Sequence, residues 1–162
     1  MNHLFDHGHK EIRFVSGPSF SIDSAFREAG WRDALTARGL QPAEPMAGDW
    51  TANSGYRIGL KLAEDKEMTA VYAANDQMAM GVIAALRSRG RRVPQDVSVV
   101  GVDDSLGDIV PDCRLTTVRF DNKRVGMWAV DKIAGAEGVA PGVEHMLFPG
   151  VLVEGDTVRD WR

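Results

Sequence analysis

The sequence has little cysteine and no long apolar run, and each absence excludes a class of protein. Cys113 is the only cysteine among 162 residues, so an internal disulfide and a cysteine-rich zinc site are both excluded. No uninterrupted apolar stretch approaches the roughly 18 residues that span a bilayer. Residues 1–10 are rich in His and charge, unlike a signal peptide. We therefore expect a cytoplasmic protein that does not bind membranes.

The sequence also lacks an excess of positive charge, with 19 Lys and Arg against 23 Asp and Glu and a formal net charge of −4. Affinity for duplex DNA rests mainly on basic side chains that neutralise phosphates, so this balance argues against unaided nucleic-acid binding. The one basic cluster, residues 87–92, falls at the end of an expected helix, where cations are favoured. An apolar content of 44% and a charged content of 26% are ordinary for one globular domain.

Short apolar runs typical of strands alternate with longer segments of helical period. The runs occupy residues 12–15, 43–46, 71–74, 97–102 and 115–120. Residues 97–102 are almost continuously apolar, as in a strand that is covered on both faces. Five strands alternating with helices predict an α/β fold with a doubly wound, mainly parallel five-stranded sheet. Residues 144–154 are expected to add two short strands about Pro149-Gly150.

Capping residues and apolar spacing locate the helices between these runs. One helix is expected to end at Gly39 and another at Gly90. Three are expected to begin, the first near Thr51 or Ser54 and the others near Asp76 and Asp121. The side chains expected to face the core are Phe26, Trp31, Ala34, Leu35, Tyr56, Leu60, Ala63, Met80, Ile83, Ala84 and Leu86.

Polar and aromatic side chains follow the strands, at the edge where ligands bind in open α/β sheets. Arg27 lies in the helix after the first strand, and Trp50, Asn75 and Asp103 follow the second, third and fourth. This mixture suits a sugar, because polar groups pair with hydroxyls and an indole covers the apolar face of the ring. No activated nucleophile with its base is evident, so we expect no enzyme.

Two clusters invite a metal interpretation that their spacing does not favour. Adjacent strand-end residues point in different directions, so Asp103 and Asp104 cannot share a metal without further ligands. One carboxylate contacting a ligand and the other capping the loop is the better interpretation. The histidines at positions 3, 7 and 9 lack a cysteine partner, and we interpret them as a solvated helix end. We expect neither a metal nor a cofactor.

Six stretches, in order, resemble the lactose-repressor (LacI/GalR) family of bacterial transcription regulators. They are residues 9–18, 27–31, 48–51, 74–81, 93–104 and 115–118. The resemblance implies a type I periplasmic-binding-protein fold, in which a sugar or nucleobase effector lies between two lobes. It also implies that Arg27 binds effector hydroxyls, that Trp50 stacks on the ligand, and that Asn75 and Asp103 hydrogen-bond it.

Two further ligand-binding candidates stand where the sequence departs from the family pattern. Asp23 replaces a serine found in several sugar-responsive members, which would change the preferred effector. Phe120 replaces a polar residue, often Gln, near the crossover between the lobes.

The resemblance also implies a division of the chain. Residues 1–119 correspond to the C-terminal lobe of the effector-binding domain, and residues 120–162 to the crossover helix and strands of an otherwise absent N-terminal lobe. Val125, Trp128 and Ile133 are then expected to lack their usual partners, so that this segment packs differently, pairs with another chain or is poorly ordered.

These expectations define an effector-binding and dimerising part of a transcription regulator. The resemblance implies that operator DNA is bound only through a helix-turn-helix that precedes the lobes. The alternatives are a fragment of a periplasmic-type sugar-binding protein, a fragment with no activity of its own, and an enzyme with Asp103 or Asp76 as general base. Only fold-level analogy supports the enzyme.

Overall fold

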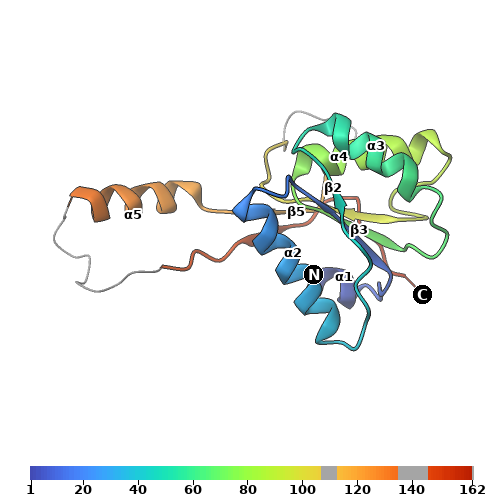
Figure 1. Ribbon diagram of the computed structural model, residues 1–162, viewed down its shortest axis with the longest axis horizontal. Coiled ribbons are helices and arrows are strands. Elements are labelled where there is room, and N and C mark those ends of the chain that lie inside the picture. Colours follow the sequence, from blue (N-terminus) through green and yellow to red (C-terminus); the bar gives the residue numbers. More distant parts are fainter. Residues whose placement is uncertain (107–112, 135–145, 162) are drawn as a thin grey trace.

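A parallel sheet lies at the centre of the computed structural model, which describes residues 1–106, 113–134 and 146–161 (Figure 1). Its strand order is β2-β1-β3-β4. These strands are β1 (Ile12–Ser16), β2 (Met46–Ala47), β3 (Ala70–Ala73) and β4 (Ser98–Val100). Every pair is parallel, with Val15 opposite Met46, and Val71 opposite both Arg13 and Val99. The predicted α/β architecture with a mainly parallel sheet is confirmed.

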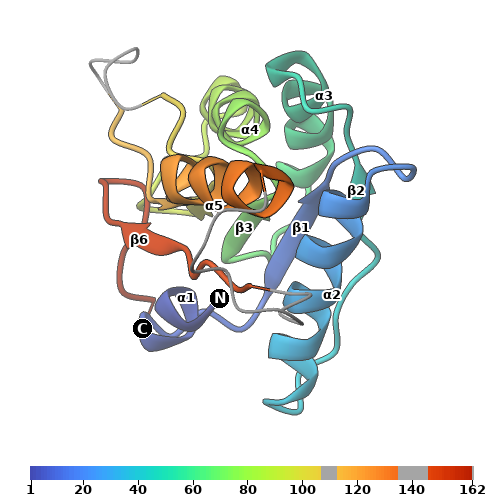
Figure 2. The same cartoon turned by 90° about the vertical axis from the view of Figure 1, so that its left-hand side faces the viewer.

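Helices cover both faces of this sheet, as in a doubly wound fold (Figures 1 and 2). The short α1 (Asn2–Asp6) and α2 (Ile22–Thr36) lie on one face, and α3 (Ala52–Leu62) and α4 (Asp76–Ser88) on the other. Both faces of the middle strands are therefore removed from water. The β-branched residues Val71, Val97 and Val99 are fully buried, which explains the continuous apolar run that predicts β4.

Helix α2 packs on the sheet through Trp31. Its Nε1 donates to the carbonyl of Ile12 at 3.2 Å, and its ring stacks on Phe14 with 5.4 Å between centroids. Trp31 and Leu35 are buried as predicted, but Phe26 is 70% exposed, so its assignment to the core is wrong. At about 100° per residue, Phe26 lies roughly 180° around the helix from Leu35.

Helices α3 and α4 approach closely because glycines line their contact. A Cβ added to Gly81 would lie 2.0 Å from the Ala52 carbonyl oxygen, and one added to Gly55 would lie 2.2 Å from the Met78 carbonyl oxygen. Thr51 caps α3 as predicted, whereas Asn75, one residue earlier than predicted, caps α4. The glycine-lined faces of α3 and α4 form the contact, and side chains on the other faces remain outside it. Tyr56 and Ala84 are exposed, so their assignment to the core is wrong.

The predicted fifth strand does not extend the main sheet, which therefore has four strands rather than five within the described ranges. Thr116 forms one parallel bridge to Val100, and β5 (Thr117–Arg119) then pairs antiparallel with β6 (Val151–Val153). The ladder is interrupted because Asp103 and Asp104 adopt φ values of 107° and 52°, outside the range of an extended strand. Of the two strands expected about Pro149-Gly150, β6 forms, and residues 144 and 145 lie outside the described residues.

Helix α5 (Asn122–Ala134) projects away from the sheet and its covering helices (Figure 1). Asp121 caps it as predicted, by accepting from the Arg124 amide at 3.0 Å. None of its described residues is buried, and Ile133 is 88% exposed. Trp128 packs edge-on against Phe148 with 6.1 Å between centroids, while much of the apolar surface of α5 faces solvent, as expected for an unpartnered segment.

The final residues run back to the main sheet and reach its amino-terminal end. Thr157 exchanges two hydrogen bonds with Val99, of 2.7 and 2.8 Å, and the Trp161 amide donates to the His7 carbonyl at 2.7 Å. Both termini lie at this end of the molecule (Figure 2). His9 is fully buried there, so its assignment to a solvated helix end is wrong. No helix among the described residues is long and apolar enough to cross a membrane.

Candidate ligand-binding site

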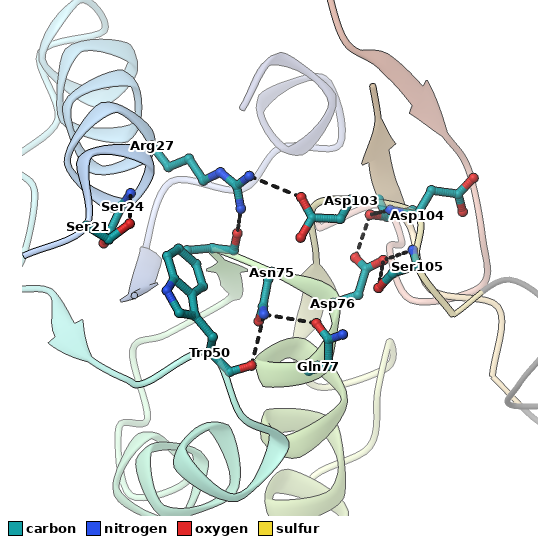
Figure 3. Close-up of polar contacts among 12 residues, drawn as sticks. Ser21, Ser24, Arg27, Trp50, Asn75, Asp76, Gln77, Asp103, Asp104 and Ser105 are labelled. Carbon is teal, nitrogen blue, oxygen red and sulfur yellow. Dashed lines mark hydrogen bonds and ion pairs between the residues drawn. The ribbon is translucent and has the colours of Figure 1, made fainter. Parts of the chain in front are cut away.

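Arg27 contacts the residues that follow two strands, at the carboxyl-terminal edge of the sheet (Figure 3). From α2 its guanidinium donates to the Ala74 carbonyl, and Nη2 donates to Asp103 Oδ1 at 3.0 Å. Both side chains are only partly exposed, with fractions of 21% for Arg27 and 37% for Asp103. Burial raises the pKa of the Asp103 carboxyl, and the Arg27 charge opposes that rise. The pair therefore presents a cation and an anion side by side.

Trp50 lies next to this pair, with its ring centroid 5.6 Å from the Arg27 Cζ. It directly precedes the cap of α3 and has a φ of 72°, in the left-handed region. Its carbonyl accepts from Asn75 Nδ2 at 2.9 Å, which helps to hold that backbone conformation. Asp49 supports the same turn by accepting from the Thr51 amide at 3.0 Å. The indole is thus placed by backbone contacts and lies beside the charged pair (Figure 3).

Asn75 lies beside this group, but its polar atoms are already paired within the protein. Its Oδ1 accepts from the Met78 amide at 2.9 Å, and its Nδ2 also donates to Gln77 Oε1 at 2.9 Å. The side chain caps α4 and is 6% exposed. Asn75 therefore connects the start of α4 to the Trp50 turn through hydrogen bonds.

Asp23 and Phe120 lie in an open hollow of about 390 Å³ at the same edge of the sheet. Arg27 also lines this hollow, together with Phe26, Asn122, Val125 and Phe148. Arg27 therefore links the hollow to Asp103 and Trp50. The structure brings all six residues predicted for the site to one edge of the main sheet.

The predicted site residues did not include four that line the hollow, Phe26, Asn122, Val125 and Phe148, nor the neighbouring Asp76. Phe26 was assigned to the core, although its helical angle relative to Leu35 places it on the opposite face, beside Arg27. Phe148 lies in the segment predicted to form two short strands, and nothing in that pattern indicated a place in the site. Asp76 was predicted as a helix cap and considered as a general base, but its burial at 1% exposure, in hydrogen-bond contact with Ser105 after the Asp103–Asp104 loop, was not expected.

The chemistry of the site is that of recognition. It combines a guanidinium, carboxylates and aromatic rings around an open space, which matches hydroxyl groups and the apolar face of a sugar ring. Within the described ranges, no group of three or more His, Cys, Asp and Glu side chains is arranged to hold a metal ion.

Comparison with known proteins identifies relatives along almost the whole chain. A family model described as a periplasmic binding protein-like domain matches residues 1–158. The lactose operon repressor of Escherichia coli (strain K12) is 37% identical over 97% of this chain and 44% of its own length. The HTH-type transcriptional repressor PurR of Pasteurella multocida (strain Pm70) is 36% identical over 79% of this chain and 39% of its own length. The chain thus spans less than half of either relative.

A solved structure agrees with these sequence relationships. The lac repressor dimer bound to operator and the anti-inducer ONPF superimposes with a TM-score of 0.87 at 34% identity. The match covers 98% of this chain and 56% of that one. The arrangement described above, α5 and β6 included, is therefore similar to that in a repressor of greater length.

Proposed function

This chain belongs to the LacI family of transcription regulators, and from that premise we propose that it is the effector-sensing part of a sugar-responsive repressor. The observation that carries the proposal is the Arg27–Asp103 pair beside Trp50 at an open hollow. A charged pair offers a donor and an acceptor to vicinal hydroxyls, and the indole face accepts the apolar face of the ring.

Each site residue has a proposed role. Arg27 and Asp103 bind ligand hydroxyls, Trp50 stacks on the ring, and Asn75 adds a hydrogen bond or holds the Trp50 turn. Asp23 and Phe120 border the hollow and set which sugar is accepted. An acid and an aromatic ring at these positions favour a ligand with a donor group at one end and an apolar face at the other.

The organisation proposed for the whole regulator follows the division of the chain. Residues 1–119 act as one lobe, and residues 120–162 contribute the crossover to a second lobe in the longer protein. Ligand bound between two lobes selects one angle between them, and in a homodimer that angle sets the spacing of the helix-turn-helix heads on operator DNA. The regulator works in the cytoplasm. A role as a periplasmic-type transport protein is not favoured, because the relatives reported above are repressors.

Thermal melts of this chain with galactosides, other sugars and purines test the proposal. A ligand at 100 times its Kd stabilises the folded state by ~2.7 kcal/mol, a readily measured shift for a domain of this size. We expect a shift with sugars that disappears in Trp50→Ala. Trp161→Ala removes an indole at the opposite end of the sheet and should retain the shift. A shift with purines alone, or one that survives Trp50→Ala, would contradict the proposal.

A further inference from the structure

Asp76 is the one acidic side chain that is buried in the described part of the chain, with 1% of its surface exposed. Among the residues that the structure describes, only neutral groups donate hydrogen bonds to its carboxylate. Oδ1 accepts from Thr117 Oγ1 at 2.6 Å, and Oδ2 accepts from the Ser105 amide at 2.7 Å and its hydroxyl at 3.4 Å (Figure 3). Burial of a carboxylate without a cation costs free energy, so a contribution to stability does not explain why an acid stands here.

Asp76 and its two partner residues, Ser105 and Thr117, belong to three separate segments. Asp76 opens α4 next to Asn75, Ser105 follows the Asp103–Asp104 loop, and Thr117 begins β5, which leads through Phe120 into α5. The Asp76 amide also donates to the Val102 carbonyl at 2.9 Å, just before that loop. One carboxylate therefore ties the ligand-facing loop to the strand that leaves the lobe.

The loop needs such support because its backbone is uncommon for non-glycine residues. Asp103 and Asp104 have φ values of 107° and 52°. The Asp103 amide donates to the Val118 carbonyl at 2.8 Å, and the Asp104 amide donates to Thr117 Oγ1 at 3.3 Å. The Thr117 hydroxyl thus donates to Asp76 and accepts from the loop, so the two hydrogen bonds are coupled.

Gly101 provides the space that this arrangement requires. A Cβ at position 101 would lie 2.3 Å from Asp76 Oδ1 and 2.8 Å from Leu115 Cδ2. The carboxylate consequently packs directly on the backbone of the chain that follows β4. The Gly101 backbone on one side and the hydrogen bonds from Ser105 and Thr117 on the other hold the carboxylate in place.

We propose that Asp76 is a positioning residue that couples the conformation of Asp103 to the orientation of β5 and the start of α5. The Thr117 hydroxyl transmits this coupling. The inference deepens the proposed function, because in a two-lobed regulator the same crossover carries the ligand-induced change of angle. The coupling between Asp103 and β5 can be measured in this chain alone, without a ligand.

The Thr117→Val and Thr117→Ser pair tests the coupling without removing the buried acid. Valine keeps the shape and removes the hydroxyl, whereas serine keeps the hydroxyl. Spin labels on cysteines introduced at the exposed Lys61 in α3 and Lys123 in α5, in a Cys113→Ala background, report the orientation of the crossover. Carboxyl NMR of Asp103 reports the loop in the unlabelled proteins. A circular dichroism melt defines the temperature range in which each variant is folded.

We expect Thr117→Val to shift and broaden the distance distribution between the labels and to lower the pKa of Asp103 toward its ordinary value. Thr117→Ser should match the parent in both measurements. Equal effects of valine and serine would overturn the proposal, as would an unchanged distance distribution and Asp103 titration in Thr117→Val. Because no ligand is used, failure of this proposal is distinct from failure to bind a sugar.

Discussion

The indole of Trp50 lies directly over Gly17. A Cβ at Gly17 would be 2.3 Å from Cζ2 and 2.4 Å from Cη2 of that ring, far inside van der Waals contact. Gly17 follows β1 and Trp50 follows β2, two neighbouring parallel strands. The aromatic surface of the site therefore depends on a missing side chain at the end of one strand and a left-handed backbone at the end of the next.

Gly17→Ala is expected to displace the indole without unfolding the protein. Any residue tolerates the backbone at Gly17, because its φ is not positive, so the only obstacle is the ring. Loss of stacking should weaken sugar binding by about tenfold, or roughly 1.4 kcal/mol. Isothermal titration with the sugar identified by the melts measures the loss. Gly39→Ala is not a suitable control because φ there is 69°, whereas Gly30→Ala has open space around it. Parent-like affinity in Gly17→Ala would contradict the assignment of Trp50.

Asp103→Asn should reduce sugar affinity by about 10- to 100-fold, since a charge-assisted hydrogen bond to a hydroxyl is replaced by a neutral one. Its effect on stability should be small because the Arg27–Asp103 pair is partly exposed. Asp96→Asn is the matched control. It removes an ion pair with Arg92, 2.6 Å long, on the surface after α4. If both variants bind sugar like the parent, Asp103 does not contact the ligand.

The sequence was sufficient to predict the parallel sheet and the edge where its polar residues gather, because both follow from local patterns. The apolar run 97–102 and the position of Asn75 after β3 are examples. The burial of Asp76 and the contact between Trp50 and Gly17 could not be predicted. Both depend on contacts between segments that are far apart in the sequence, and the local pattern of residues does not predict such contacts. His9 was misinterpreted for the same reason, since Arg159, 150 residues later, supplies part of its environment.

The contact between α3 and α4 predicts opposite effects for two glycines in helices. Gly81→Ala gains about 1 kcal/mol of helix propensity, but its Cβ would lie 2.0 Å from the Ala52 carbonyl oxygen and 2.7 Å from the Tyr56 amide nitrogen. Overpacking of this kind costs about 1–3 kcal/mol or more, so a net loss of stability is expected. Gly30→Ala in α2 meets no atom within 4 Å and should stabilise by up to about 1 kcal/mol. Urea denaturation compares them, and a stabilising Gly81→Ala would show that the helices are farther apart.

Amide hydrogen exchange should be much faster in α5 than in α4. Both helices have 13 residues, but α4 has eight buried residues and α5 has none. A helix of this length without tertiary packing is marginal in water. Gly126→Ala, where a Cβ meets no atom of the described residues within 4 Å, should slow exchange in α5 by raising helix propensity. Exchange in α5 as slow as in α4 would indicate that another surface covers this helix.

Stability should fall between neutral and mildly acidic pH because of His9. Its Nδ1 and Nε2 are 3.1 Å from Thr69 Oγ1 and from the Arg159 carbonyl oxygen, and no atom of the ring is in reach of solvent. Burial lowers the pKa of His9 from 6.5 to about 4, and the Arg159 carbonyl opposes that shift. The nearby charges of His7, Arg159 and His3 add to it.

The direction of the effect follows from which state binds the proton. Between pH 6.5 and about 4 the unfolded chain is protonated at His9 while the folded chain is neutral there, so acid favours unfolding. The contribution of neutral His9 to the free energy of unfolding is fully present above pH 6.5. It is lost as the pH falls toward 4, and the loss amounts to about 3 kcal/mol. Urea denaturation at pH 7, 5.5 and 4 measures the loss. His9→Gln keeps a neutral hydrogen-bonding side chain and should be less stable at pH 7 but show a flatter dependence on pH. Carboxylates and His3 titrate in both proteins, so the difference between the two curves isolates His9, and parallel curves would place its titration outside this range.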